Sequence, residues 1–184
     1  MSEQRDANIM ETTVESRRVF DGLILHIDHL TNRLPNGRLA QREAARHIGA
    51  VAIIPVDAEG CVWLVRQFRA CIDQVLLEIP AGKLDFAGED RLSAAKRELS
   101  EETGLTARTW THLTDLFTAP GFSDERISLY LARDLEPGER HPDDDEFLNT
   151  QRVPLAEAVA AAARGEINDA KTLCALLMAE KLCR

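Results

Sequence analysis

Residues Gly82–Leu105 read GKLDFAGEDRLSAAKRELSEETGL and end in a run of carboxylates followed by a glycine. Residues three and four positions apart share one face of a helix. Glu98, Glu101 and Glu102 are therefore expected to lie on one patch, where like charges repel each other. A bound divalent cation removes that repulsion, and magnesium is usually held by a few carboxylates together with the phosphates of a substrate. The segment thus predicts a helix that binds a metal ion.

The same segment resembles the Nudix box, whose pattern is Gly-x5-Glu-x7-Arg-Glu-U-x-Glu-Glu-x-Gly-U, with U an aliphatic residue. Every position from Glu89 to Leu105 fits this pattern. One departure is that six residues separate Gly82 from Glu89, where the pattern has five. The extra residue falls in a predicted loop, where an insertion costs little free energy. The register of the carboxylates is therefore unchanged, and the insertion affects only the expected placement of Gly82.

An alternative interpretation of this segment is a solvated, charged surface helix. In that case Arg97 pairs with Glu101, and Thr103-Gly104 forms an ordinary C-terminal cap. The additional match of Glu89, the aliphatic positions and both glycines favours the metal-binding interpretation.

Composition limits the class of protein. With 184 residues, 45% of them hydrophobic and 29% charged, the chain is expected to fold as a globular domain with a real core. Its net charge of −9 argues against nucleic-acid binding, which normally needs a basic face. No apolar run approaches the roughly 20 residues that span a bilayer. The cysteines form no CxxC pair, and the polar N-terminus lacks a signal-peptide core. A cytoplasmic protein without nucleic-acid or membrane partners is therefore expected.

Apolar periodicity and turn residues divide the chain into strands and helices. Their order predicts an α/β sandwich with a mixed sheet between helical layers. We expect a flexible N-terminus at 1–13, antiparallel strands within 14–48 that are joined by the Asn-Gly turn at Leu34–Arg38, and the main domain at 49–184. The predicted strands lie within Ser16–Leu30, Arg38–His47, Gly49–Val56, Cys61–Phe68, Val75–Ile79, Trp110–Phe117, Arg126–Ala132 and Phe147–Pro154, and the predicted helices are Glu89–Glu102, Leu155–Arg164 and Asp169–Leu182.

Segments outside the box resemble the ADP-ribose pyrophosphatase branch of the Nudix superfamily. The segments that carry this resemblance are Ser16–Glu43, Val65–Arg69, Leu77–Gly82, Ala119–Glu125 and Gly165–Thr172. The resemblance implies the Nudix α/β/α fold and a homodimer in which the N-terminal strands are exchanged. It further implies hydrolysis of a nucleoside diphosphate sugar, with ADP-ribose giving AMP and ribose 5-phosphate as the expected reaction.

The expected metal ligands are Glu98 and Glu102, followed by Glu101, with Mg²⁺ as the ion and Mn²⁺ as the alternative. The resemblance adds the backbone carbonyl of Ala81. We expect Arg97 to orient a glutamate rather than to touch the substrate.

Resemblance also implies a general base on a loop after the box. The acidic loop offers Glu146, which we favour, with Asp144 and Asp145 as competitors, and Glu125 is expected to position metal or water. The expected substrate-binding residues are Arg69, Glu78, Gly121 and Phe122, joined by Arg18, Phe20, Arg42 and Glu43 from the N-terminal segment of a second subunit.

Plainer interpretations exist for several of these residues. Phe68 is expected to be a core aromatic, in which case strand alternation turns Arg69 away from the core, toward a cleft or toward water. Among activities, GDP-mannose or another nucleotide sugar is the nearest alternative substrate. A non-catalytic nucleotide-sugar sensor is the alternative from a different class, although it need not keep all three glutamates. An RNA-cap hydrolase would need a basic groove, for which the sequence offers no candidate.

Overall fold

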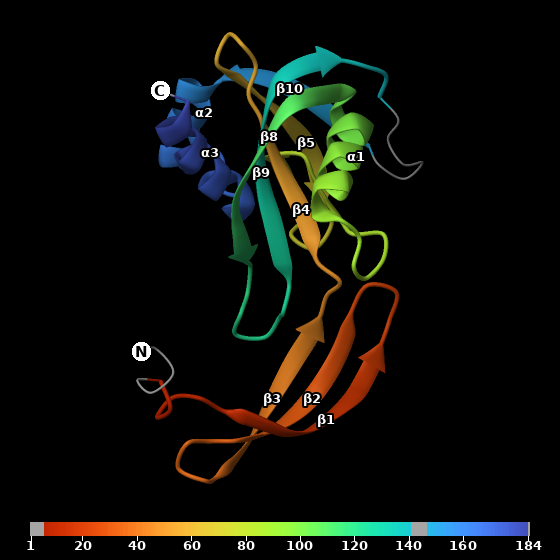
Figure 1. The fold of residues 1–184 in the computed structure, drawn as a ribbon, viewed down its shortest axis with the longest axis vertical. Coiled ribbons are helices and arrows are strands. Elements are labelled where there is room, and N and C mark those ends of the chain that lie inside the picture. Colours follow the sequence, from red (N-terminus) through yellow and green to blue (C-terminus); the bar gives the residue numbers. More distant parts are fainter. Residues whose placement is uncertain (1–5, 141–146, 184) are drawn as a thin grey trace. The chain divides into compact units, whose positions relative to one another are not determined.

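The computed structural model describes residues 6–140 and 147–183. The chain divides into two compact units, shown in Figure 1. The first contains residues 1–47 together with Ala119–Glu125, and the second contains Ile48–Thr118 together with residues 126–184. A segment from the middle of the chain therefore belongs to the same unit as the N-terminal strands.

The first unit is built on a three-stranded antiparallel sheet of order β1-β2-β3. Its strands are β1 (Thr12–Asp21), β2 (His26–Arg33) and β3 (Leu39–Arg46). The single apolar pattern expected over Ser16–Leu30 is divided between β1 and β2 by a turn, in which the N–H of Gly22 donates to the carbonyl of Leu25 (2.9 Å). The second turn contains Gly37 at φ 83°, a left-handed conformation that glycine adopts without steric cost.

The second unit contains two sheets. A mixed four-stranded sheet has the order β7-β4-β9-β8, with β4 and β9 parallel, and an antiparallel three-stranded sheet has the order β10-β5-β6. The strands are β4 (Ala50–Pro55), β5 (Cys61–Arg69), β6 (Gln74–Glu78), β7 (Ala81–Lys83), β8 (Leu105–Phe117), β9 (Arg126–Pro137) and β10 (Leu148–Pro154).

Helices cover both faces of the mixed sheet, as Figure 1 shows. Val51 and Ile53 of β4 pack in one buried cluster with Leu99 of α1 (Arg91–Thr103). Ala52 and Ile54, which alternate with them, pack in a second cluster with residues of α2 (Leu155–Ala163) and α3 (Ala170–Leu182). Because both faces of β4 are covered, the strand reads as an unbroken apolar run. The predicted α/β architecture with a mixed sheet between helices is confirmed.

Several details differ from the expectation. The three-residue strand β7 was not predicted, and β8 begins at Leu105, directly after the helix, rather than at Trp110. The prediction that Phe68 is a core residue is wrong, because Phe68 is 54% exposed. The first half of β5 is buried, but its last residues extend beyond the core, so strand alternation there no longer leads to a buried face. Within the described residues, no helix has both the length and the apolar content to cross a membrane.

Candidate active site

Helix α1 has defined ends that fix its carboxylates in register. The side chain of Asp90 accepts a hydrogen bond from the N–H of Ser93 (2.8 Å) and caps the first turn. Gly104, at φ 70°, ends the helix, and its N–H donates to the carbonyl of Ser100 (2.8 Å). Between these caps, Glu98 and Glu102 lie on the buried face of the helix.

Both glutamates face the backbone of β7. The N–H of Ala81 donates to Oε2 of Glu102 (3.2 Å). A Cβ atom built on Gly82 would lie only 2.2 Å from the carboxylate of Glu98, so the glutamate occupies the space of the missing side chain. Despite the six residues between Gly82 and Glu89, Gly82 therefore lies beside Glu98. The insertion is taken up by the loop before the helix, where Glu89 accepts from the N–H of Asp85 (2.7 Å).

Arg97 connects the acidic side chains of this region. Its Nη1 donates to Oε1 of Glu98 (2.8 Å) and to Oε2 of Glu101 (2.9 Å). Its Nε also lies 3.3 Å from Asp85 and 3.8 Å from Glu89. The arginine thus orients two glutamates and offsets part of their mutual repulsion. The i,i+4 pair between Arg97 and Glu101 is the contact expected of a surface helix, but the burial of Glu98 and Glu102 is not.

The donor set fits a hard divalent cation that is held jointly with a substrate. Glu98 is 7% exposed and Glu102 is 1% exposed, and two buried carboxylates so close on one helix are costly unless they are paired or bind a cation. Across 6–140 and 147–183, no three or more His, Cys, Asp or Glu side chains are already gathered as a cation site. Carboxylates are nevertheless the ligand type that a hard divalent cation takes from a protein when substrate phosphates supply the rest, and Glu98 and Glu102 are of that type.

A second polar cluster joins the ends of β5 and β6 to the start of α3. Arg69 donates from Nε to Oε1 of Glu78 and from Nη2 to Oε2, each at 2.7 Å, which is the bidentate geometry of an arginine–carboxylate pair. Lys171 donates to the same carboxylate and lies 3.1 Å from Asp169. Asp169 in turn caps α3 by accepting from the N–H of Thr172 (3.0 Å).

Glu78 is 1% exposed, and its carboxylate oxygens face these two cations. Burial opposes ionisation of this carboxyl, but the hydrogen bond from Arg69 and the charge of Lys171 outweigh burial and hold the pKa of Glu78 below its usual value. The geometry is that of a residue that holds Arg69, whereas Arg69 itself remains partly exposed. Asp169 and Lys171 lie in Gly165–Thr172, one of the segments that resemble the ADP-ribose pyrophosphatase branch, but no individual role was predicted for either residue. An N-cap pattern indicates Asp169, but no local pattern links Lys171 to Glu78, which lies 93 positions earlier.

Four of the predicted substrate-binding residues meet in the first unit. A pocket of about 370 Å³ lies between the three-stranded sheet and Ala119–Glu125. Its lining includes Arg42, Glu43, Gly121 and Phe122. Hydrogen-bond donors, acceptors and an exposed aromatic ring are thus available around one space.

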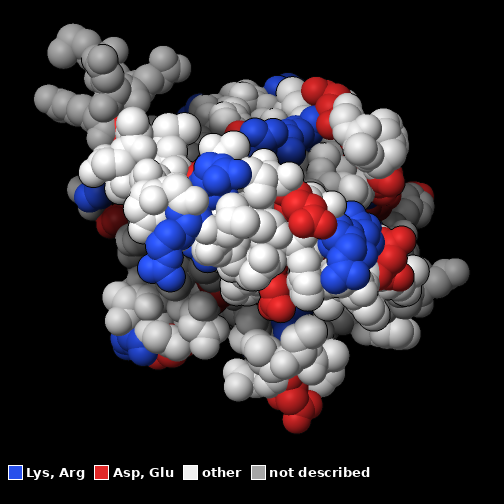
Figure 2. All heavy atoms as spheres, turned by 90° about the horizontal axis from the view of Figure 1, so that it is seen from below, with Lys and Arg blue, Asp and Glu red and all other residues white. Residues whose placement is uncertain are grey.

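The other predicted residues of the first unit lie apart from this lining. Phe20 is 55% exposed, and Arg18 donates to Asp21 (2.7 Å) and to Asp28 (2.6 Å). The predicted base Glu146, with its competitors Asp144 and Asp145, lies outside the described residues. On the face drawn in Figure 2, side chains of both charge signs are interspersed with uncharged surface.

Comparison with known proteins agrees with this geometry. The NUDIX domain family matches residues 46–176. An ADP-ribose pyrophosphatase of Bacillus subtilis is 39% identical over 171 residues, which is 92% of each chain. An ADP-ribose pyrophosphatase of Mycobacterium tuberculosis is 40% identical over 169 residues, covering 90% of this chain and 81% of the relative. A crystal structure of an ADP compounds hydrolase superposes with a TM-score of 0.84 at 26% identity and covers 95% of both chains. The chain therefore belongs to the NUDIX domain family, as its helix motif predicted.

Proposed function

We propose that this protein hydrolyses the diphosphate bond of a nucleoside diphosphate sugar, with ADP-ribose as substrate and AMP and ribose 5-phosphate as products. The observation that carries the proposal is the buried pair Glu98 and Glu102, which faces the backbone of Ala81 and Gly82. The relatives named ADP-ribose pyrophosphatase support this choice of substrate.

The carboxylates of Glu98 and Glu102, with Glu101 and the carbonyl of Ala81, would hold Mg²⁺, or Mn²⁺ as the alternative ion. Such an ion, when bound, neutralises phosphate oxygens and lowers the pKa of a coordinated water. Arg97 keeps Glu98 and Glu101 in place through its two hydrogen bonds.

Hydrolysis requires a base for the attacking water. We assign this role to Glu146, with Asp144 and Asp145 as competing candidates, and we assign Glu125 to positioning the water. The base takes one proton as the water oxygen bonds to phosphorus and the bridging P–O bond breaks. General base catalysis of this kind contributes about 10²–10⁴-fold to the rate.

Two groups of residues are proposed to bind the substrate. The partly exposed guanidinium of Arg69, oriented by Glu78, is a donor for the diphosphate. The pocket of the first unit, with Arg42, Glu43, Gly121 and Phe122, is a candidate for the nucleoside. Arg18 and Phe20 lie outside this lining and are proposed, with Arg42 and Glu43, to hold the substrate from the N-terminal segment of a second subunit.

A homodimer with exchanged N-terminal strands is part of the proposal, because the first unit exposes apolar residues such as Phe20 and Leu23. The described cysteines are all free, which supports a reducing, cytoplasmic location. The mixed charge of the face in Figure 2 and the negative net charge support a small-molecule substrate rather than a nucleic acid.

The test is to incubate the purified protein with Mg²⁺ and a panel of nucleotide sugars and to resolve the products by chromatography. Fastest release of AMP from ADP-ribose is the expected result. Faster release of GMP from GDP-mannose would keep the chemistry and change the substrate. Binding of a nucleotide sugar without cleavage of any would replace the enzyme by the sensor alternative.

A further inference from the structure

The segment Ala119–Glu125 connects β8 to β9 in sequence, yet its hydrogen bonds lead to β3. The N–H of Ala45 donates to the carbonyl of Phe122 (2.7 Å), and the N–H of Asp124 donates to the carbonyl of Ala45 (3.2 Å). Ala45 and Ser123 form a parallel bridge. The segment therefore continues the N-terminal sheet for a short distance.

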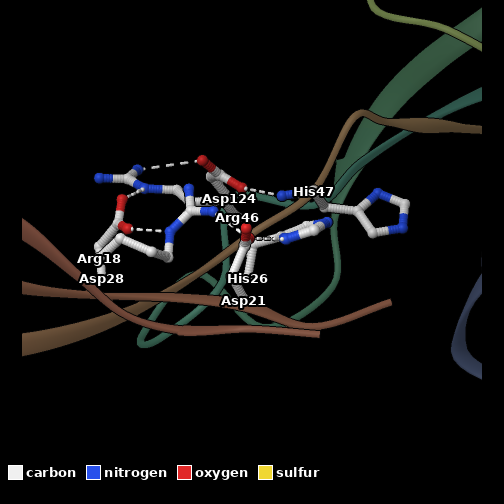
Figure 3. Close-up of polar contacts among 7 residues, drawn as sticks. All are labelled: Arg18, Asp21, His26, Asp28, Arg46, His47 and Asp124. Atoms are coloured by element: carbon white, nitrogen blue, oxygen red, sulfur yellow. Dashed lines mark hydrogen bonds and ion pairs between the residues drawn. The ribbon is translucent and has the colours of Figure 1, made fainter. Parts of the chain in front are cut away.

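A chain of charged side chains reinforces this attachment, as Figure 3 shows. Oδ1 of Asp28 accepts from Nε of Arg18 (2.6 Å), and Oδ2 accepts from Nε of Arg46 (2.9 Å). Nη1 of Arg46 reaches on to Oδ2 of Asp124 (3.0 Å), whose other oxygen accepts from the N–H of His47 (2.8 Å). The series Asp28–Arg46–Asp124 thus links β2, β3 and the connecting segment.

Asp28 is unusual among the residues of this sheet. The other described positions of β1, β2 and β3 are exposed or half-buried, and Asp28, at 8% exposure, is the buried one. A buried carboxylate is tolerated when charged donors satisfy it. Here the hydrogen bonds from Arg18 and Arg46 hold the pKa of Asp28 below its usual value, so the carboxylate is ionised at neutral pH. Its place in the sheet is explained by the arginines that it orients, not by an apolar core.

Glu125 directly follows the anchored residue Asp124. The N–H of Glu125 donates to Oγ of Ser123 (3.1 Å), and one of its carboxylate oxygens lies 3.7 Å from Nε2 of His47. The neighbours of Glu125 on this side therefore belong to the anchored segment and to the end of the N-terminal sheet.

We propose that Asp28 and Arg46 are positioning residues, which fix Ala119–Glu125 on the N-terminal sheet and thereby set the place of Glu125 for the reaction. The inference rests on the proposed function, in which Glu125 positions the attacking water. The three-stranded sheet accordingly contributes to turnover as well as to substrate binding.

The first test does not depend on activity. Hydrogen exchange of the Ala45 and Asp124 amides is compared in the wild type, Arg46→Gln and Arg152→Gln. Arg152 is the matched control, because it bridges Asp57 (2.6 Å) and Glu59 (3.2 Å) in the second unit with similar exposure. Arg46→Gln is expected to speed exchange of these amides about threefold to tenfold, whereas Arg152→Gln leaves it unchanged. Equal exchange in all three proteins would overturn the proposal.

The second test is a double-mutant cycle on kcat for ADP-ribose with Arg46→Gln and Glu125→Gln. Arg46 also lines the pocket, so a direct effect of Arg46→Gln on substrate binding is expected to appear in KM, and the cycle therefore compares kcat at saturating ADP-ribose. If Arg46 acts through Glu125, then Arg46→Gln lowers kcat in the wild type but has no further effect once Glu125 is glutamine. If Arg46→Gln lowers kcat by the same factor whether residue 125 is glutamate or glutamine, Arg46 does not act by positioning Glu125.

The conservative variant Arg46→Lys keeps the charge but not the double contact, and it is expected to show intermediate exchange and kcat. If Arg46→Gln does not fold, as judged by circular dichroism, the comparison of Arg46→Lys with the wild type decides. A wild type that does not cleave ADP-ribose would refute the proposed function, and the exchange measurements would still decide whether Arg46 anchors the segment.

Discussion

The carboxylate of Glu98 fills the space beside Gly82 that any other residue at this position would need for its side chain. The contact distance of 2.2 Å to a Cβ atom built on Gly82 is far below van der Waals contact, so one of the two groups would have to move. Gly82 does not have a positive φ. The glycine is therefore needed for space rather than for backbone conformation.

Gly82→Ala is expected to displace Glu98 and lower kcat by about 10²-fold, because small misplacement of a reacting group has effects of that size. The free energy of unfolding should fall by about 1–3 kcal/mol from overpacking. Steady-state kinetics and denaturant unfolding measure the two effects. Gly60→Ala is the control, since that glycine has open space around its α-carbon. Because alanine is strained at the φ of 74° that Gly60 adopts, Gly60→Ala should lower stability and leave kcat unchanged. An active Gly82→Ala variant would mean that Glu98 does not need its present place.

Glu98→Gln and Glu102→Gln should each reduce kcat by about 10²–10³-fold, because each removes a ligand charge that supplies several kcal/mol at the transition state. Folding should survive, since each change removes one of two buried like charges. Activity assays with Mg²⁺ and metal titration check the loss of kcat and of the ligand, and thermal unfolding checks that folding survives. Glu136→Gln, an exposed glutamate that pairs with Arg108, is the matched control. Near-normal turnover in both box variants would remove the metal assignment.

Lys171→Met is expected to lower the free energy of unfolding by about 1.5–3 kcal/mol, the range for a hydrogen bond to a charged group, because Arg69 still satisfies Glu78. The KM for ADP-ribose should rise, with a smaller effect on kcat, because Glu78 loses one of its two cationic partners and holds Arg69 less firmly. Lys181→Met tests the same substitution at an exposed position of the same helix and should leave both quantities unchanged. If Lys171→Met and Lys181→Met have the same KM for ADP-ribose, Lys171 does not help to orient Arg69.

Stability should also depend on the ionisation of Glu78. Because its folded pKa lies below the ordinary value of 4.5, the ionised form contributes stability that is complete above pH 4.5 and is lost as the pH falls through the folded pKa. Glu78→Gln removes this contribution at all pH values. The difference in unfolding free energy between wild type and variant should therefore be largest near pH 7 and shrink on acidification. A difference that grows with acid would show that burial, not the two cations, dominates the pKa of Glu78.

The features that local chemistry determines are predictable from the sequence. The spacing of Glu98 and Glu102 predicts their shared face, and the apolar run of β4 predicts a buried strand, because both depend on helix and strand periodicity. The features that depend on contacts between distant segments are not predictable in this way. The three residues of β7 become a strand only through pairing with β4, and Phe68 is exposed because β5 extends beyond the core. No local pattern indicates that Lys171 binds Glu78 or that Ala119–Glu125 attaches to β3.

The hairpin turn between β1 and β2 offers the sharpest test of the proposed dimer. Leu23 is 96% exposed, and Ile24 and Leu25 beside it are 64% and 56% exposed. A contiguous apolar tip of this kind is rare on a free surface, and in the proposed dimer it would contact the partner chain. The double variant Leu23→Ser/Ile24→Ser should sediment more as a monomer than the wild type does. On dilution, its specific activity should begin to fall at a higher protein concentration than that of the wild type. Leu182→Ser, a comparably exposed leucine at the end of α3, is the control. If the wild type sediments as a monomer and keeps its specific activity on dilution, each active site is complete within one chain.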